Sequence, residues 1–141
     1  MIRVSAGDMS PQDTELLEKA QDLLEKVWVH GRHEVATALR TQDGKIHTGV
    51  HVEGSCRRSS ICAEGIAIGT VLSNGSALDI EAVVSVQIKP ADHFRVIAPC
   101  GVCRELISDY SPHARVWVTA GETLETYQAL DLLPEKSRRV W

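Results

Sequence analysis

Two short segments hold the residues of this chain that are best suited to chemistry, Cys62-Ala63-Glu64 and Pro99-Cys100-Gly101-Val102-Cys103. Cys100 and Cys103 have the C-x-x-C spacing that lets two thiolates hold one ion. If Cys62 joins them, three thiolates can bind zinc and leave its fourth position open, as catalytic zinc sites do. Glu64 would then lie close enough to exchange protons with water in that position. The pattern predicts a zinc site with a place for water.

Other interpretations of these residues remain open. Cys56 could supply a fourth thiolate and make the zinc site structural, although this leaves Glu64 without a role. The C-x-x-C pair alone could be a redox pair, which predicts a reversible disulfide and no tightly held metal. Glu64 could merely complement a helix dipole. In a reducing compartment, four cysteines that include a C-x-x-C pair favour metal over disulfides.

Length and composition limit the class of protein. The chain has 141 residues, of which 43% are hydrophobic and 24% charged, so we expect a single domain over 1–141 with its core at about 11–135. The net charge of −4 argues against duplex nucleic acid as a partner. We find no signal peptide, twin-arginine stretch or membrane-spanning run, and therefore expect a cytoplasmic protein without a membrane partner.

The elements that must position these residues alternate between helix and strand, which predicts a sheet covered by helices. Apolar residues repeat at helical spacing after Ser10-Pro11, and Asp43-Gly44 between two apolar runs predicts a hairpin. We expect helices over 11–27, 62–72 and 99–110, strands over 35–41, 46–52, 80–88 and 114–119, loops over 54–60 and 89–94, a short strand or turn over 121–127, and a helical turn over 131–133. Two helix N-termini, which stabilise thiolates, would then carry the cysteines.

On these motifs the chain resembles the cytidine deaminase family. The signature of zinc deaminases is H-x-E…P-C-x-x-C, with cysteine able to replace the histidine, and this chain has the all-cysteine form. The similarity covers about residues 11–135 and includes three further segments: Asp43–Val50 at the hairpin, His51-Val52-Glu53 in place of Asn-x-Glu, and Leu132-Leu133-Pro134.

The resemblance implies an α/β protein with a three-layer α/β/α fold around a five-stranded mixed sheet. It also implies hydrolytic removal of the exocyclic amine from a cytosine-type nucleoside, as in pyrimidine salvage. Carried over, Cys62, Cys100 and Cys103 would hold one Zn²⁺ per subunit, Glu64 would shuttle protons, and the main chain of Ala63 would bind the base. Small members of the family are typically homotetramers, so we expect a homotetramer or a dimer that acts on a small nucleoside.

Two positions of the expected substrate pocket depart from the family pattern, and a third retains it. His51 stands where the family has a sugar-binding Asn, although Glu53 is retained and could accept a bond from a ribose hydroxyl. His33 stands in place of the aromatic residue that stacks on the base. Each of these three residues also has a plain alternative: His51 as packing, Glu53 as a solvated charge at a strand end, and His33 as an exposed loop histidine.

Departures near the cysteines and at the chain end raise further expectations. Gly65 stands where small tetrameric members often have arginine. Arg58 or Arg104 could supply the missing positive charge near the thiolates, or either could equally be a surface residue. Gly65 also resembles the blasticidin-S deaminase branch, whose substrates carry bulky additions on cytosine. Trp141 could form a lid over a neighbouring subunit's site, or belong to a disordered terminus.

The sequence therefore predicts a deaminase of cytidine or deoxycytidine. The alternative substrate is a modified cytosine, such as a blasticidin-S-like nucleoside, or another aminopyrimidine. Outside this class, a zinc-stabilised binding protein without catalysis remains open. Editing of polynucleotides is not favoured, because we find no basic groove or aromatic platform for a strand.

Overall fold

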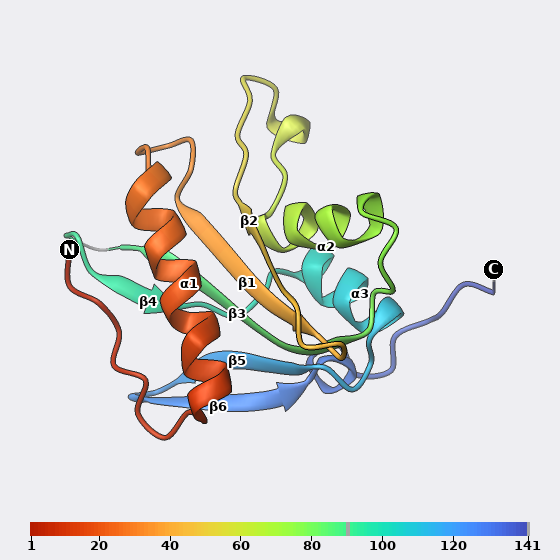
Figure 1. The fold of residues 1–141 in the computed structure, drawn as a ribbon. Coiled ribbons are helices and arrows are strands. Elements are labelled where there is room, and N and C mark those ends of the chain that lie inside the picture. Colours follow the sequence, from red (N-terminus) through yellow and green to blue (C-terminus); the bar gives the residue numbers. More distant parts are fainter. Residues whose placement is uncertain (90, 141) are drawn as a thin grey trace.

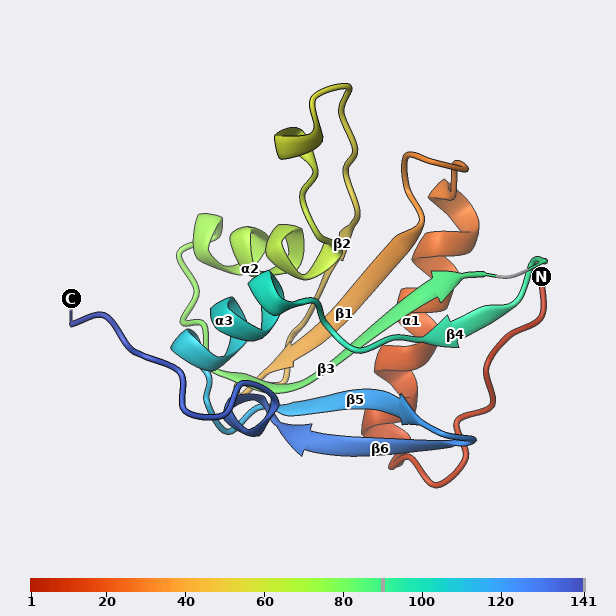
Figure 2. The same ribbon diagram turned by 180° about the vertical axis from the view of Figure 1, so that it is seen from behind.

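A mixed sheet with helices on both faces forms the body of the protein (Figures 1 and 2). The computed structural model describes residues 1–89 and 91–140, with only the main chain of Arg57. Helix α1 (Pro11–Val27) covers one face of the sheet, and helices α2 (Ala63–Ser73) and α3 (Gly101–Tyr110) cover the other. The expected three-layer α/β/α architecture is confirmed.

The sheet has six strands, in the order β2-β1-β3-β5-β6, with β4 paired to β3 beside this path. The strands are β1 (Val35–Thr41), β2 (Ile46–Val50), β3 (Ile80–Ile88), β4 (Phe94–Val96), β5 (Arg115–Ala120) and β6 (Thr123–Gln128). Pairing is antiparallel except between β3 and β5, which are parallel and joined through α3. Short 3-10 helices, η1 (Arg57–Ser59) and η2 (Ala129–Leu132), lie in the connections.

The two faces of the sheet hold separate apolar clusters because successive strand side chains alternate between faces. On the α1 side, Leu16, Leu17 and Leu24 pack with Ala36, Ala38, Val84 and Val86. On the α2 and α3 side, Ala67, Val71 and Ile107 pack with Leu39, Val83 and Val116. Residues 37 and 85, one position away from Ala36 and Val84, therefore point toward α2, where the chemistry-bearing residues lie.

Helix α1 starts where the sequence predicts. Ser10 Oγ accepts the Asp13 N–H at 3.2 Å, and Pro11 occupies the first helical position. The buried Asp13 carboxylate ties this helix to the sheet, because it accepts bonds from Arg40 at 2.6 Å, Trp117 at 2.8 Å and Arg115 at 3.0 Å. Burial alone would raise the pKa of Asp13, but these three donors bring it below its ordinary value.

The sheet differs from the expected five strands. Residues 94–96 form β4 along β3, whereas a loop was expected over 89–94. With only three residues in buried-exposed-buried alternation, β4 is too short to give a periodic signal. β2 ends at Val50 rather than at residue 52, and the turn expected over 131–133 is η2, two residues earlier. The segment expected as a short strand or turn is the edge strand β6.

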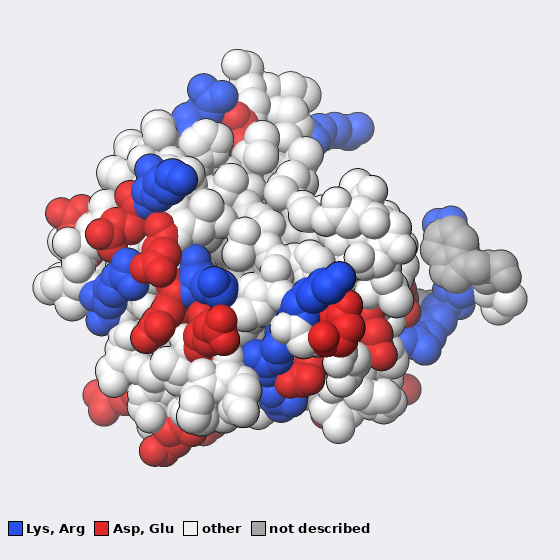
Figure 3. Space-filling model, in the orientation of Figure 1, with Lys and Arg blue, Asp and Glu red and all other residues white. Residues whose placement is uncertain are grey.

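Charged side chains of both signs lie among one another over the surface that Figure 3 shows. Arg3, for example, bonds Asp22 at 2.7 Å and Glu25 at 3.0 Å on the outer side of α1. On this face, the described side chains form no continuous basic strip of the kind that follows a nucleic-acid backbone. Of the helices described, none combines the length and the apolar character needed to cross a bilayer.

Candidate active site

Three cysteine sulfurs come together at the N-terminal ends of α2 and α3. Cys62 is the N-cap residue of α2, Cys100 is the N-cap residue of α3, and Cys103 is buried in the first turn of α3. All three sulfurs lie within 4.8 Å of one another, and Cys62 Sγ is 3.4 Å from Cys100 Sγ. This spacing fits three thiolates on one zinc ion, each at about 2.3 Å from the metal.

The three thiols have different electrostatic surroundings. Burial raises the pKa of Cys62 to about 11, and the neighbouring Cys100 adds to this rise. Burial and the nearby Glu64 charge also raise the pKa of Cys103. Burial acts in the same direction on Cys100, but the main-chain N–H of Cys103 and the neighbouring thiols lower its pKa overall. The main-chain N–H groups at the start of α3 thus favour the thiolate form of Cys100, and a divalent cation would favour thiolates at all three positions.

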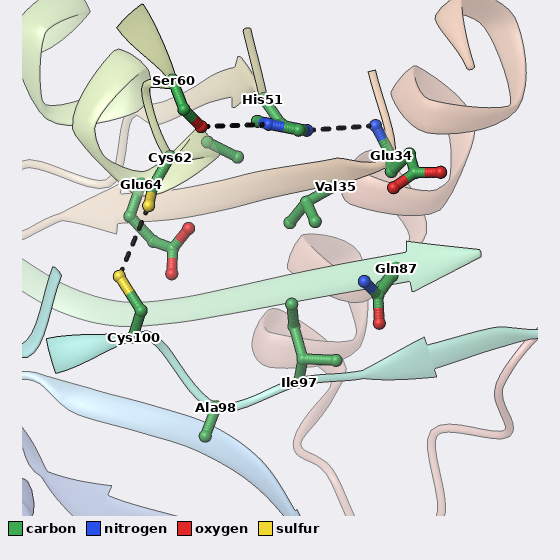
Figure 4. Close-up of a pocket in the computed structure, with 11 residues that line it drawn as sticks. Glu34, Val35, His51, Ser60, Cys62, Glu64, Gln87, Ile97, Ala98 and Cys100 are labelled. Atoms are coloured by element: carbon green, nitrogen blue, oxygen red, sulfur yellow. Dashed lines mark hydrogen bonds between the residues drawn. The ribbon is translucent and has the colours of Figure 1, made fainter. Parts of the chain in front are cut away.

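Glu64 lies in the first turn of α2 with only 4% of its surface exposed. Its carboxyl faces the space beside Cys62 and Cys100 (Figure 4). Burial raises the pKa of this carboxyl, while its own main-chain N–H and the hydroxyls of Thr37 and Ser85 partly offset the rise. A carboxyl with a raised pKa can take up and return a proton near neutral pH.

A pocket of about 260 Å³ opens beside the sulfur cluster. Helices, strands and loops all contribute to its wall, which consists of Glu34, Val35, His51, Ser60, Cys62, Ala63, Glu64, Gln87, Ile97, Ala98 and Cys100. Val35 and Ile97 face each other across the pocket, and the polar residues lie at its ends (Figure 4). A mainly apolar cavity with a few convergent polar groups is the usual form of a small-molecule site.

His51 is held at both ring nitrogens, at the side of the pocket away from Cys100 (Figure 4). Its Nδ1 accepts the Glu34 N–H at 3.5 Å, so Nε2 carries the proton and donates to Glu53 Oε2 at 2.8 Å. Ser60 Oγ donates to the same Glu53 oxygen at 3.0 Å. The hydrogen bond from His51, and then that from Ser60, lower the pKa of Glu53. Glu53 Oε2 is therefore engaged by the protein's own donors.

His33 does not line the pocket, although the sequence suggested it as the residue that stacks on a base. Its ring Nδ1 lies 2.9 Å from the main-chain oxygen of His51. The next two residues, Glu34 and Val35, supply the pocket wall instead. His33 thus orders the main chain that carries His51.

The remaining candidate residues that the structure describes are not among those that line the pocket. Arg58 is exposed in η1, and Arg104 donates to the main-chain oxygens of Pro99 at 2.9 Å and Leu132 at 3.1 Å. Cys56 is exposed and lies outside the three-sulfur cluster, so the structure does not bring it in as a fourth ligand. Trp141, the expected lid, lies outside the described residues.

Sequence reasoning missed three residues that support the site. Thr37 and Ser85 are polar positions inside two apolar strands; the Thr37 hydroxyl bonds Glu64, and the Ser85 hydroxyl bonds that of Thr37. Gly49 lies in β2 against α2, and a glycine inside a strand is a signal of close backbone approach. These signals were present in the sequence, but they do not reveal a role for the three residues until the fold shows where Glu64 and α2 lie.

Comparisons with known proteins agree on one family. The family described as "Cytidine and deoxycytidylate deaminase zinc-binding region" matches residues 10–119. Blasticidin-S deaminase of Bacillus cereus is 38% identical over 136 residues, which cover 94% of this chain and 96% of that protein. Cytidine deaminase of Halalkalibacterium halodurans is 31% identical over 98 residues, or 69% of this chain and 70% of that one. A crystal structure of cytidine deaminase from Burkholderia pseudomallei has a TM-score of 0.74 at 30% identity, and the match covers 90% of this chain and 98% of that one.

Proposed function

This chain belongs to the cytidine and deoxycytidylate deaminase family, and from that membership we propose that it releases ammonia hydrolytically from the exocyclic amine of a cytosine-type nucleoside. The observation that carries the proposal is the position of the Glu64 carboxyl. It is buried, faces the pocket, and lies beside three sulfurs that are within 4.8 Å of one another.

Cys62, Cys100 and Cys103 would hold one zinc ion, since thiolate sulfurs at this spacing suit that metal. Bound there, zinc lowers the pKa of a water molecule and so supplies a nucleophile at neutral pH. The two helix N-termini favour the negative charge of the thiolates. Arg104 supports the same turn from outside by bonding the Pro99 oxygen.

Glu64 moves protons in this proposal. Its carboxylate takes one proton from water and gives it to the ring nitrogen next to the carbon that bears the amine. The oxygen of water bonds to that carbon, and the second proton of water passes through Glu64 to the departing nitrogen, which leaves as ammonia. The ring keeps a carbonyl where the amine was, so the atoms balance. Burial of the carboxyl raises its pKa and suits it to both accepting and donating.

The pocket beside Glu64 would hold the flat base. Val35 and Ile97 face each other across it and would contact the two faces of the ring. The main chain of Ala63, at the start of α2, would bind the base edge. The ring is thereby oriented with its amine toward the cysteines, and such orientation supplies much of the rate enhancement in enzymes.

For the substrate itself, we propose that a modified nucleoside such as blasticidin S reacts better than cytidine. Two observations favour this choice. Blasticidin-S deaminase of Bacillus cereus matches nearly the whole chain at 38% identity. In addition, His51 fills the place of the sugar-binding Asn and engages Glu53 at 2.8 Å, which leaves less of that carboxylate for ribose. Cytidine and deoxycytidine remain the second candidates.

An ammonia-release screen of zinc-loaded protein tests the proposal. Blasticidin S, cytidine, deoxycytidine, cytosine and adenosine are assayed side by side, and we expect release from a cytosine-type nucleoside with the highest kcat/KM for blasticidin S. A higher kcat/KM for cytidine would overturn only the choice of substrate. Zinc-bearing, folded protein that releases ammonia from none of them would favour the zinc-stabilised binding protein instead. The homotetramer or dimer stays a prediction, to be tested by light scattering coupled to size-exclusion chromatography.

A further inference from the structure

Two hydroxyl residues lie side by side in the centre of the sheet, directly under α2. Thr37 in β1 and Ser85 in β3 are register partners. Thr37 is 0% exposed and Ser85 is 3% exposed. Their hydroxyl oxygens are 2.7 Å apart, which is a good hydrogen bond. Both residues point toward the face of the sheet that α2 covers, where Leu39 and Val83 are their apolar neighbours on the same strands.

The hydroxyl pair ends on the carboxyl of Glu64. Thr37 Oγ1 donates to Glu64 Oε1 at 3.3 Å. Because the Thr37 proton is used there, Ser85 must donate in the bond between the two hydroxyls, so the chain runs from Ser85 to Thr37 to Glu64. A buried hydroxyl is costly without a partner, and a chain of hydrogen bonds strengthens each member. The three groups therefore form one connected unit between two strands and the first turn of α2.

We propose that Thr37 and Ser85 are positioning residues, which hold the Glu64 carboxyl in the orientation needed for proton transfer. This inference rests on the proposed deaminase function. Threonine is β-branched and has few side-chain rotamers, so its hydroxyl is a rigid anchor. Ser85 turns the Thr37 proton toward Glu64 by donating to the Thr37 oxygen. With Oε1 held from below by the sheet, the carboxyl stays at the pocket wall, and little orientation is lost before reaction.

Removing the Thr37 hydroxyl while keeping its shape tests the proposal. For Thr37→Val we expect kcat to fall about tenfold or more, as for other supporting groups around active sites, with KM changed less than about twofold, since no substrate contact is removed. Thr37→Ser restores the hydroxyl and should recover most of kcat. Thr70→Val is the matched control, because the exposed Thr70 hydroxyl bonds Ile66 O in the same helix α2 at 2.8 Å and should not affect kcat.

Zinc content and melting temperature are measured for each variant alongside the kinetics. If wild-type protein releases no ammonia, the proposed function fails before this inference is tested. If wild-type protein is active and Thr37→Val keeps its kcat, or if Thr37→Ser does not recover what Thr37→Val loses, the positioning role is wrong. Should Thr37→Val fail to fold, Ser85→Ala decides by the same readout: a lower kcat at unchanged KM supports the role, and a wild-type kcat overturns it.

Discussion

Gly49 in β2 lies directly against the main chain of Ala67 in α2: a Cβ on Gly49 would stand 2.5 Å from the Ala67 nitrogen. It would also stand 2.6 Å from the main-chain oxygen of Ala63. These atoms belong to backbone and cannot rotate away. The absence of a side chain at Gly49 therefore sets how close α2 approaches the sheet, and with it the position of Cys62 and Glu64.

For Gly49→Ala we expect a loss of about 1–3 kcal/mol in the free energy of unfolding, the usual cost of overpacking, because α2 must shift. Zinc content and kcat should fall as well, since the shifted helix carries Cys62 and Glu64. Urea denaturation and metal analysis check these outcomes. Gly69→Ala is the control: a Cβ there meets nothing within 4 Å, so this change within α2 should stabilise by about 0.5–1 kcal/mol. A Gly49→Ala protein as stable as wild type would contradict the close packing.

The second prediction follows from the positions of the four cysteines, three of which form the sulfur cluster while Cys56 lies outside it. Cys103→Ser removes a buried member of the sulfur cluster, so zinc per chain should drop well below one equivalent. Cys56→Ser should leave zinc content and activity unchanged, because Cys56 is exposed and outside that cluster. Metal analysis after gel filtration gives the answer. Equal zinc loss in both variants would instead favour a closed, four-cysteine site.

The buried Asp13 cluster predicts how stability depends on pH. The pKa of Asp13 is below its ordinary value of 3.8 when folded, so its contribution is complete above that value and is lost as pH falls through the lowered folded pKa. Asp13→Asn should cost about 3 kcal/mol near neutral pH, as breaking a buried ion pair does. The difference from wild type should shrink in acid below pH 3.8.

The exposed Asp22 provides the comparison for Asp13. Its salt bridge to Arg3 lies on the surface, with 66% of the Asp22 side chain exposed, so Asp22→Asn should cost less than about 1 kcal/mol. Urea denaturation of both variants at neutral and acid pH measures the costs. A constant difference between Asp13→Asn and wild type across this range would be inconsistent with a lowered Asp13 pKa.

The type of residue at position 51 should control substrate preference. His51→Asn removes the bond to Glu53 and replaces the ring by the residue type that the family uses for the sugar. We expect the ratio of kcat/KM for cytidine to that for blasticidin S to rise about tenfold, the scale of a changed polar contact. His113→Asn, at an exposed position that bonds Gln128, serves as the control. An unchanged ratio in His51→Asn would remove His51 from the specificity account.

The fold could be predicted from the sequence wherever a long periodic pattern exists. The α1 boundaries follow from Ser10, Pro11 and the apolar stripe, and the β1–β2 hairpin follows from Asp43-Gly44. β4 escaped prediction because Phe94–Val96 is too short for a period and forms only by pairing with β3. Whether this segment forms a strand is decided by its pairing with β3 rather than by its own residues.

The candidate site also contains residues that sequence could predict and residues that it could not. The residues nearest the proposed metal position, such as Cys62 and Glu64, are recognisable by their type and spacing, so sequence alone indicated them. The packing residues around them cannot be recognised from their type and spacing. His33 could not be distinguished from Val35 as a pocket residue, because residues two positions apart in an extended segment share a face. Only the fold shows that His33 belongs to the turn that pairs with Val29. Thr37 and Ser85 acquire a role only through the register of β1 and β3.

The most direct test of the central claim is ammonia release measured beside zinc content for wild-type protein and Glu64→Gln. We expect Glu64→Gln to keep its zinc and its fold and to lose at least about a hundredfold in kcat on the cytosine-type substrate, since an amide cannot carry the proton. Glu122→Gln, a change at an exposed turn, should match wild type in both measurements. A Glu64→Gln protein that keeps its zinc and still releases ammonia at the wild-type rate would contradict the account.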